Sequence, residues 1–342
     1  MNPAEPIAAR GADLTTLTPG TLAQTAISIE VGAASIRSAL IDAGASILAR
    51  KTGITPQINQ AELVDAIAVP AQRLAEQGAR DGLPPTAIGV AVPGVIDEEL
   101  GQIRRSANLV WKDTPLRRIL EDRLHLPTVL IQDARAAALG EALLGAGRHA
   151  PDFLFMVLGD GIGSAVVLAG RPRRGAHAVA GELGHIRVKP NGLPCGCGGH
   201  GCVETLSSVR ALTRRFTLAT GDLASVEQVL EKAAAGDTAA SAIWREAMAG
   251  LGEAMAAAVA VLDCDLVVLG GTLPALAGDR FLRAIEAELE GRLSLVPVPR
   301  LAVAQLGDTA SLLGAAAAAF EAAGVTGVSQ RWRVLPQPPN RR

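Results

Sequence analysis

Residues 153–170 have the sequence FLFMVLGDGIGSAVVLAG, which is an apolar strand, a turn of small residues and a second apolar strand. Residues 26–48, AISIEVGAASIRSALIDAGASIL, have the same design. In this earlier copy, Ile27, Ile29 and Val31 alternate with smaller or polar residues and therefore share one face of a strand. The repetition of one hairpin at two distant places indicates an internal duplication. We predict two related lobes that each open with a β-hairpin.

Strands and helices alternate outside these hairpins. Strand-like apolar runs occupy residues 87–94, 128–132, 266–270 and 301–305, and helical patterns occupy 60–77, 115–124, a stretch from Ala134 onwards and 310–324. This alternation predicts an α/β protein. The Ala-rich stretch 240–261 is interrupted by charged side chains, so we expect a buried helix there rather than a membrane span.

The composition narrows the range of partners. The chain has 342 residues, a net charge of −2 at pH 7, 2% aromatic residues and no tyrosine. A chain with so little net charge and so few stacking side chains does not favour nucleic acid or an anionic membrane as a partner. Residues 1–25 lack the basic start and apolar run of a signal peptide. We therefore expect a cytoplasmic protein whose four cysteines are metal ligands or structural residues.

A cysteine-rich loop follows the second hairpin. It has the sequence GELGH, nine further residues, and then CGCGGHGCVE, which ends at position 204. Cys195, Cys197 and Cys202 supply three thiolates and His185 supplies an imidazole, a standard closed ligand set for tetrahedral Zn²⁺. The intervening glycines let the backbone fold around an ion. We predict a structural zinc site without zinc–hydroxide chemistry.

Two alternatives to this ligand set stay open. His200 is a rival fourth ligand, because spacing alone does not exclude it. The three cysteines could also be reduced loop residues, or include a Cys–Cys bridge. The remaining cysteine, Cys264, lies beside the apolar run 266–270 and is expected to be a small core residue.

The cysteine loop, together with the rest of residues 26–324, resembles the ROK family of bacterial sugar kinases and sugar-responsive repressors. The family's Glu-x-Gly-His element matches Glu182, Gly184 and His185, and its Cys-x-Cys-Gly-x-x-Gly-Cys-x-Glu element matches residues 195–204. The resemblance implies the two-lobed actin-like ATPase (ribonuclease H-like) fold, with sugar in a cleft between the lobes and ATP alongside it. It also implies a homodimer.

Domain boundaries are expected on the same basis. We expect a flexible segment at 1–25 and a small N-terminal lobe at 26–135, completed by a C-terminal helix at 308–324. The large C-terminal lobe is expected at 136–307, with the zinc loop at 185–204. The tail, residues 325–342, contains Pro and Arg and is expected to be flexible.

The resemblance also implies the sugar contacts. In the family the histidine holds zinc and touches the sugar, and the two glutamates accept hydrogen bonds from sugar hydroxyls, which carries over to His185, Glu182 and Glu204. Carboxylates suit this task because each accepts several directed hydrogen bonds. The alternative is that both acids are ordinary surface residues. Asn108, in ANLVWKDTPL, and Gln132, which replaces a family Asn, are the other expected substrate contacts.

Asp133 is the candidate catalytic residue. An apolar strand delivers it to a strand end, where open α/β sheets place their ligands. It also matches the family's catalytic Asp in Asn-Asp-Ala-x-Ala-Ala. A carboxylate there can accept the proton of a hydroxyl that attacks a phosphoryl group, so we predict that Asp133 is the general base. An Asp before an Ala-rich helix also suits an N-cap, and the two roles are compatible.

Kinases of this fold bind ATP phosphates through backbone N–H groups in glycine-containing turns. The turns expected here lie at residues 30–35, at 159–163 and after the apolar run 266–270. The last of these could instead be a plain strand-to-helix turn. The expected nucleotide-binding residues are Gly32, Ser35, Gly161, Gly163, Gly270 and Gly271.

Acidic residues in these turns raise a question about ATP. Glu30 replaces a shorter acid, Ala33 replaces a glycine, and Asp160 replaces a hydroxyl residue of the family pattern. A negative charge about 4 Å from a phosphate costs on the order of 4 kcal/mol at an effective dielectric of 20. A Mg²⁺ ion between them would reverse the sign of that interaction.

Two functions are therefore weighed. The first is an ATP-dependent kinase that uses ATP with Mg²⁺ to phosphorylate a hydroxyl of a hexose or a hexose-like cyclitol. The second is a non-catalytic sugar-binding regulator of the ROK type that lacks its DNA-binding domain. Against it, the family's repressors carry an N-terminal helix-turn-helix unit, and the residues before the first expected strand are too few for such a unit and a linker. Asp133 and the Gly270-Gly271 pair favour the kinase, whereas the altered phosphate turns favour the regulator.

Overall fold

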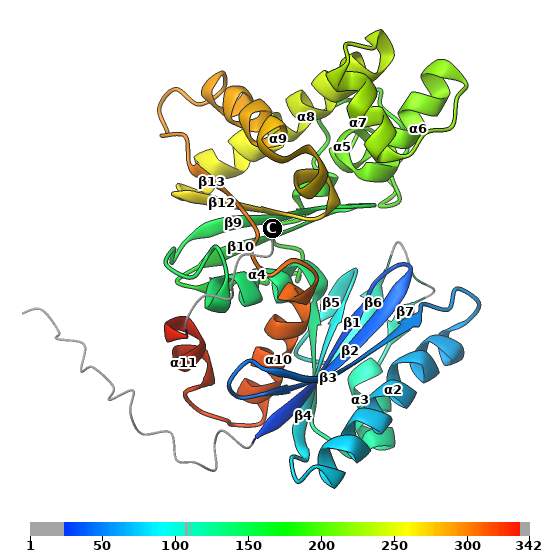
Figure 1. The fold of residues 1–342 in the computed structure, drawn as a ribbon, viewed down its shortest axis with the longest axis vertical. Coiled ribbons are helices and arrows are strands. Elements are labelled where there is room, and N and C mark those ends of the chain that lie inside the picture. Colours follow the sequence, from blue (N-terminus) through cyan, green and yellow to red (C-terminus); the bar gives the residue numbers. More distant parts are fainter. Residues whose placement is uncertain (1–23, 107–108, 110, 336–342) are drawn as a thin grey trace, which may run out of the picture.

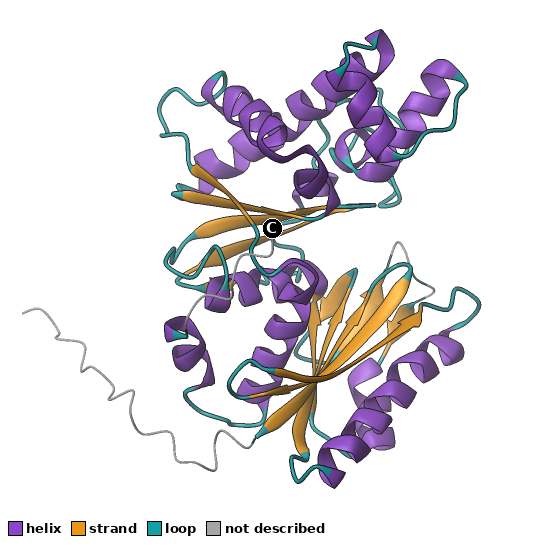
Figure 2. Cartoon of the chain, viewed as in Figure 1, coloured by secondary structure: helices purple, strands orange, loops and turns teal. Residues whose placement is uncertain are grey.

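The computed structural model describes residues 24–106, 109 and 111–335. Two five-stranded sheets lie one above the other, with helices between them and on their outer faces (Figures 1 and 2). This is the two-lobed α/β arrangement of the actin-like ATPase fold, as the sequence predicted. Asn108, an expected sugar contact, lies outside the described residues.

The small-lobe sheet has the strand order β3-β2-β1-β4-β8. The first three strands pair antiparallel, and β4 and β8 add in parallel to β1. Ile27, Ile29 and Val31 are fully buried on one face, which confirms the alternation in the sequence. The strands are β1 (Thr25–Val31), β2 (Ser35–Asp42), β3 (Ile47–Ile54), β4 (Pro85–Val92) and β8 (Thr128–Gln132).

The large-lobe sheet has the order β11-β10-β9-β12-β13. Here too the first three strands pair antiparallel and the next two are parallel, so the two sheets share one topology. This agreement supports the predicted duplication. The strands are β9 (Phe153–Leu158), β10 (Ile162–Leu168), β11 (Arg171–Pro172), β12 (Leu266–Gly270) and β13 (Arg300–Val303).

Helices α4 (Asp133–Leu144) and α10 (Ala310–Ala322) form the layer between the sheets (Figure 1). Both are rich in alanine, and small side chains let their backbones come close. A Cβ atom on Gly314 would lie 1.8 Å from the carbonyl oxygen of Ala136, so only glycine fits at this crossing. The Ser28 hydroxyl donates to the carbonyl of Leu312 and ties α10 to β1.

The remaining helices cover the outer faces. Apolar side chains of α2 (Gln60–Arg80) and α3 (Leu116–Leu124) cover the small-lobe sheet. The helices that cover most of the large-lobe sheet are α6 (Val209–Thr220), α7 (Val226–Ala234), α8 (Thr238–Leu262) and α9 (Thr272–Glu290). Two short helical segments, η1 (Leu183–His185) and α5 (Glu204–Ser207), precede them in the chain. None of the described helices is both long and apolar enough to cross a membrane.

Several elements were not predicted from the sequence. The small lobe carries the additional strand β3 and a separate three-stranded sheet of β5 (Val95–Asp97), β6 (Gln102–Arg105) and β7 (Lys112–Thr114). The single turn η2 (Gly307–Thr309) precedes α10. The boundary drawn between residues 135 and 136 falls inside α4.

The expectation of a flexible tail after residue 324 is wrong for the described part, which reaches residue 335. Residues Val328–Val334 form helix α11, and the Trp332 side chain is completely buried against Phe320. Its indole Nε1 donates a 3.0 Å hydrogen bond to the carbonyl of Ala43. Burial of one large aromatic ring with a satisfied N–H outweighs the weak helical signal of a short, Arg-containing segment.

Candidate active site

Two pockets lie between the lobes, and Asp133 lines both of them. The first, about 500 Å³, is bounded by Glu30 and Arg37 of the small lobe and by the Gly270-Gly271 turn of the large lobe. The second, about 270 Å³, is bounded by the turn at residues 159–163 and by the acidic residues near the cysteine loop. A group bound in one pocket would therefore meet a group bound in the other at the Asp133 carboxylate.

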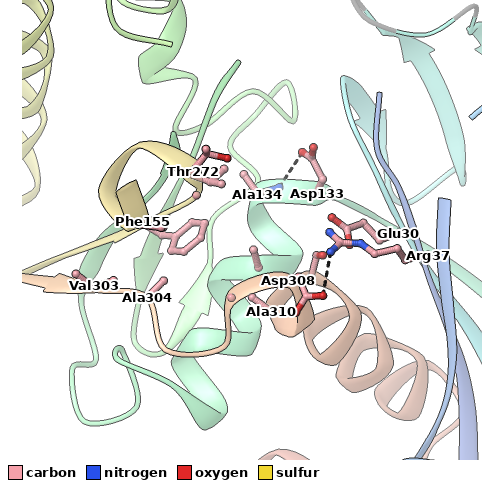
Figure 3. Close-up of a pocket in the computed structure, with 17 residues that line it drawn as sticks. Glu30, Arg37, Asp133, Ala134, Phe155, Thr272, Val303, Ala304, Asp308 and Ala310 are labelled. Atoms are coloured by element: carbon pink, nitrogen blue, oxygen red, sulfur yellow. Dashed lines mark hydrogen bonds and ion pairs between the residues drawn. The ribbon is translucent and has the colours of Figure 1, made fainter. Parts of the chain in front are cut away.

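The first pocket has two chemically different ends (Figure 3). Phe155, Val303 and Ala304 give one end an apolar lining. Carboxylates and one guanidinium lie at the other end, near the N-terminus of α4. A ligand with one apolar, aromatic part and one highly charged part fits such a cavity.

Asp133 stands at the first position of α4, directly after β8. Its Oδ1 accepts a 2.8 Å hydrogen bond from the backbone N–H of Ala134. Burial raises the pKa of Asp133 to about 6, and the nearby negative charges of Glu30 and Glu182 add to the increase. A carboxylate with a pKa this close to neutral is suited to accept and release a proton.

The helix N-cap is Gln132 and not Asp133. Gln132 Oε1 accepts a 2.8 Å hydrogen bond from the backbone N–H of Arg135, and this satisfies one of the free donors of the first turn. The longer side chain of Gln132 reaches back to that N–H, so the carboxylate of Asp133 is not needed for capping. Gln132 also lines the second pocket, and its amide N–H₂ group is not used in capping the helix.

An ion pair between Arg135 and Glu98 lies beside Gln132 at the start of α4. Neither residue was predicted from the sequence to have a functional role. Arg135 is only 1% exposed, and its Nη2 lies 2.7 Å from Glu98 Oε1. Its Nη1 donates to the carbonyl of Ala178, and the backbone N–H of Gln132 also points at Glu98 Oε1, 3.3 Å away. An arginine within an otherwise alanine-rich helical run was the signal in the sequence that could have revealed a buried ion pair here.

Glu182, His185 and Glu204 all line the second pocket. His185 Nε2 is 3.8 Å from Glu182 Oε2. Burial raises the pKa of Glu182, which the positive charge of a protonated His185 opposes. Glu204 Oε2 accepts a 2.9 Å hydrogen bond from the backbone N–H of Ile162, so one of its oxygens is already engaged within the protein.

The four predicted metal ligands converge. The ligand atoms of His185, Cys195, Cys197 and Cys202 all lie within 4.8 Å of one another. Zn–S bonds of about 2.3 Å and Zn–N bonds of about 2.05 Å in a tetrahedron require S···S separations of about 3.8 Å and N···S separations of about 3.6 Å. The Cys197 Sγ to Cys202 Sγ distance is 3.7 Å, and the Cys195 Sγ to His185 Nδ1 distance is 3.5 Å. The donor set therefore fits one zinc ion.

The alternatives for this loop fit less well. His200 is exposed and is not part of the cluster of ligand atoms. A sulfur–sulfur separation of 3.7 Å is far from a covalent disulfide of about 2.05 Å, and all four cysteines are free. Cys264 is buried away from the cluster, as expected of a core residue.

The first phosphate turn differs from the prediction. Gly32 and Ala33 line the second pocket, but Ser35 lines neither pocket. The Gly32 N–H donates to the Ser35 carbonyl and closes the turn, so that N–H does not face a ligand. A direct phosphate contact from Ser35 stays a prediction without geometric support.

The other two turns also border the pockets between the lobes. Gly161 and Gly163 line the second pocket, and Gly270 and Gly271 line the first. Gly271 has φ of 95°, and a Cβ there would lie 2.5 Å from the carbonyl oxygen of Leu158, so this turn requires glycine. Asp160 is exposed at the edge of the second pocket.

Known proteins of similar sequence and structure cover nearly the whole chain. The sequence profile of the ROK family matches residues 26–322. A glucokinase of Streptomyces coelicolor is 32% identical over 315 residues, which is 86% of this chain and 97% of the glucokinase. The crystal structure of a ROK hexokinase from Thermus thermophilus matches with a TM-score of 0.77 at 34% identity and covers 87% of this chain and 98% of that one. A ROK family glucokinase from Streptomyces griseus, in complex with glucose and AMPPNP, matches with a TM-score of 0.74 at 32% identity, over 87% of this chain and 99% of that one.

Proposed function

The chain belongs to the ROK family, and on that premise we propose that it is a sugar kinase that transfers the γ-phosphoryl group of ATP to a hydroxyl of a hexose or a hexose-like cyclitol. The observation that carries the proposal is the position of Asp133, which lines both pockets between the lobes. In this proposal the first pocket holds ATP and the second holds the sugar. Similarity to a glucokinase and to a hexokinase structure supports the same reaction class.

Asp133 is the proposed general base. The hydroxyl oxygen of the sugar forms a bond to the γ-phosphorus, the bond from that phosphorus to the bridging oxygen of ADP breaks, and Asp133 takes the hydroxyl proton. Because Oδ1 of Asp133 accepts the Ala134 N–H, Oδ2 is the oxygen available for the proton. The pKa of about 6 leaves this carboxylate mostly ionised at neutral pH, ready to accept a proton.

Sugar hydroxyls are proposed to bind Glu182, His185 and Glu204. Glu204 Oε1, which lies 4.0 Å from Cys195 Sγ, and both oxygens of Glu182 are acceptors, and the Gln132 amide is a donor in the same pocket. A ring of hydroxyls, each of which is both donor and acceptor, matches this mixture. Asn108 remains a proposed contact on the basis of the family pattern alone.

Zinc is proposed to hold these pocket residues in place. His185, Cys195, Cys197 and Cys202 would bind the ion, whose closed ligand set gives it a structural role. Because Nδ1 of His185 is the nitrogen nearest Cys195, metal on Nδ1 would keep the proton on Nε2, which lies toward Glu182. The imidazole would then present an N–H donor to the sugar pocket.

ATP is proposed to bind with Mg²⁺ in the first pocket. The apolar end suits the adenine, and the Gly270-Gly271 turn suits the phosphates within the first pocket. Gly161 and Gly163 border the second pocket, so in this proposal their turn meets only the terminal phosphoryl group, where the two pockets join at Asp133. Glu30 lines this first pocket, and its carboxylate oxygens are hard ligands of the kind that Mg²⁺ prefers, although Oε2 lies 2.6 Å from Arg37 Nη2 in this structure. The ion, when bound, neutralises charge on the transferred phosphoryl group.

The acidic residue in the second turn does not oppose this proposal strongly. The side chain of Asp160 is exposed, so solvent screens its charge. At 4 Å its repulsion of a phosphate is about 1 kcal/mol in bulk water, well below the interior value. The alternative of a non-catalytic regulator is accordingly not favoured.

A coupled ADP-release assay over a panel of hexoses, N-acetylated hexosamines and cyclitols tests the proposal. The expected result is turnover with at least one hexose by zinc-loaded protein with MgATP. Asp133→Asn is the matched control, since it keeps the size of the side chain and should remove that turnover. Absence of turnover with every compound, in protein that retains zinc and binds a sugar by calorimetry, would refute the kinase and leave a sugar-binding protein.

A further inference from the structure

The charged end of the nucleotide pocket contains one arginine among four charged lining residues. Glu30, Asp133 and Asp308 are carboxylates, and Arg37 is the cation. A pocket with this excess of negative charge repels a polyphosphate unless a positive group offsets it. Arg37 is therefore the protein group whose charge matters most for a phosphate-bearing ligand here.

Two acids hold Arg37 in place from different parts of the chain (Figure 3). Arg37 on β2 is the cross-strand partner of Glu30 on β1, and its Nη2 lies 2.6 Å from Glu30 Oε2. Its Nη1 lies 3.5 Å from Oδ2 of Asp308 in η2, just before α10. The guanidinium is thus positioned at the junction of the small-lobe hairpin and the segment that enters α10.

The two acids engage only part of the donor set of Arg37. The contact with Glu30 Oε2 is a close ion pair at 2.6 Å, although its angles do not meet hydrogen-bond geometry among the described residues. The 3.5 Å separation from Asp308 is long for a charge-assisted hydrogen bond. The planar guanidinium has five N–H donors, and phosphate oxygens are acceptors that match its fork.

We infer that Arg37 binds the phosphates of the nucleotide, in exchange for its contact with Glu30. This inference rests on the proposed function, because it assigns the first pocket to ATP. The exchange frees the Glu30 carboxylate, which is the side chain proposed to hold Mg²⁺. It also explains how an acidic pocket accepts a polyphosphate.

Arg50 provides a matched control. Its Nη1 lies 3.4 Å from the same Oδ2 of Asp308, but Arg50 does not line the pocket. A role of Arg37 limited to neutralising Asp308 would be shared by Arg50. A role in phosphate binding would belong to Arg37 alone.

The test is calorimetric titration of the full-length, zinc-loaded protein with Mg-AMPPNP, with adenosine, and with its preferred hexose. Arg37→Ala and Arg37→Met should weaken Mg-AMPPNP binding about tenfold to a hundredfold, as expected for loss of charge-assisted hydrogen bonds. Arg37→Lys should retain part of the affinity, because it keeps the charge without the fork. Affinities for adenosine and hexose should stay near the wild-type values, and Arg50→Ala should change Mg-AMPPNP affinity by no more than about fivefold.

The outcomes separate this inference from the proposed function. Arg37→Met keeps the long apolar stem, so at least one variant preserves local packing, which thermal melting checks. If the wild type binds Mg-AMPPNP and the Arg37 variants bind it equally well, the inference is wrong and the kinase proposal stands. If the Arg37 variants bound adenosine and Mg-AMPPNP with equally weakened affinity, the substitution would have collapsed the pocket, and the inference about Arg37 would again be wrong. If the wild type binds no Mg-AMPPNP, both the inference about Arg37 and the kinase proposal are wrong.

Discussion

Glu204 Oε2 accepts a 2.9 Å hydrogen bond from the backbone N–H of Ile162. Glu204 closes the cysteine loop, and Ile162 begins the strand after the second glycine turn. A Cβ atom on Gly161 would lie 2.7 Å from the same carboxylate oxygen, so the turn and the glutamate are in close contact. One side chain therefore joins the metal-binding loop, the proposed sugar pocket and a proposed phosphate turn.

Substitution of Glu204 should separate these roles. Glu204→Ala removes both the support of the turn and a sugar acceptor, so the KM values for sugar and for ATP should each rise about fivefold or more. Glu204→Gln keeps a carbonyl oxygen for the Ile162 N–H, so the KM for sugar should rise while that for ATP changes little. Steady-state kinetics with each substrate varied in turn gives both values. An unchanged KM for ATP in Glu204→Ala would show that the turn does not depend on this hydrogen bond.

The activity should depend on pH through Asp133. Its pKa of about 6 in the folded protein means that the base is increasingly protonated below that pH. We expect kcat/KM for sugar to fall tenfold per pH unit well below about pH 6, to be near half of its maximum at about pH 6 and to level off above about pH 7. A profile measured between pH 4.5 and 8 at saturating MgATP, restricted to the range in which the protein stays folded, checks this. A flat profile down to pH 5 would exclude Asp133 as the base.

Asp133→Asn should lower activity and raise stability. We expect kcat to fall about 10²–10⁴-fold, the usual contribution of a general base. Because the pKa of Asp133 is raised in the folded state, its ionised form destabilises the fold above about pH 6, and this cost disappears as the pH falls toward its ordinary value of 3.8. The variant should therefore be more stable than the wild type by about 3 kcal/mol at pH 8, with the difference shrinking toward pH 4. Urea unfolding at both pH values measures it.

Removal of zinc should weaken sugar binding before it affects nucleotide binding. Cys197→Ser deletes one thiolate of the cluster, so zinc content measured by mass spectrometry should fall, together with thermal stability and sugar affinity. Cys264→Ala is the control, because this buried cysteine lies outside the cluster and its loss should leave zinc content unchanged. Normal sugar affinity in zinc-free Cys197→Ser would break the proposed link between metal and pocket.

The crossing of α4 and α10 should tolerate no added atom at Gly314. Since a Cβ there would come within 1.8 Å of the Ala136 carbonyl, Gly314→Ala must push the helices apart. We expect the free energy of unfolding to fall by about 1–3 kcal/mol, with a loss of activity because α4 carries Asp133. Gly53→Ala, on β3 with no atom within 4 Å of the added carbon, should stay within about 0.5 kcal/mol of the wild type. Equal stability of the two variants would contradict the close helix contact.

Local patterns were sufficient to predict much of this protein. The two apolar hairpins predicted the duplicated lobes, because alternation with period two reflects one buried face of a strand. The spacing of Cys195, Cys197 and Cys202 predicted a cluster, since so few intervening residues keep the sulfur atoms within reach of one ion. The strand that ends at Gln132 likewise predicted where Asp133 would lie.

Contacts between distant segments decided the rest. Spacing alone left His200 as a rival of His185, and the folded loop brings His185, not His200, to the sulfur atoms. Arg37 and Asp308 are far apart in the chain, and nothing in either local sequence indicates that they meet. The short helix of Trp332 is stable because a groove beside Ala43 and Phe320 accepts its ring. Periodicity and spacing record which residues are buried or close in the chain, whereas the partner that a side chain meets depends on how the lobes and the α4–α10 layer pack together.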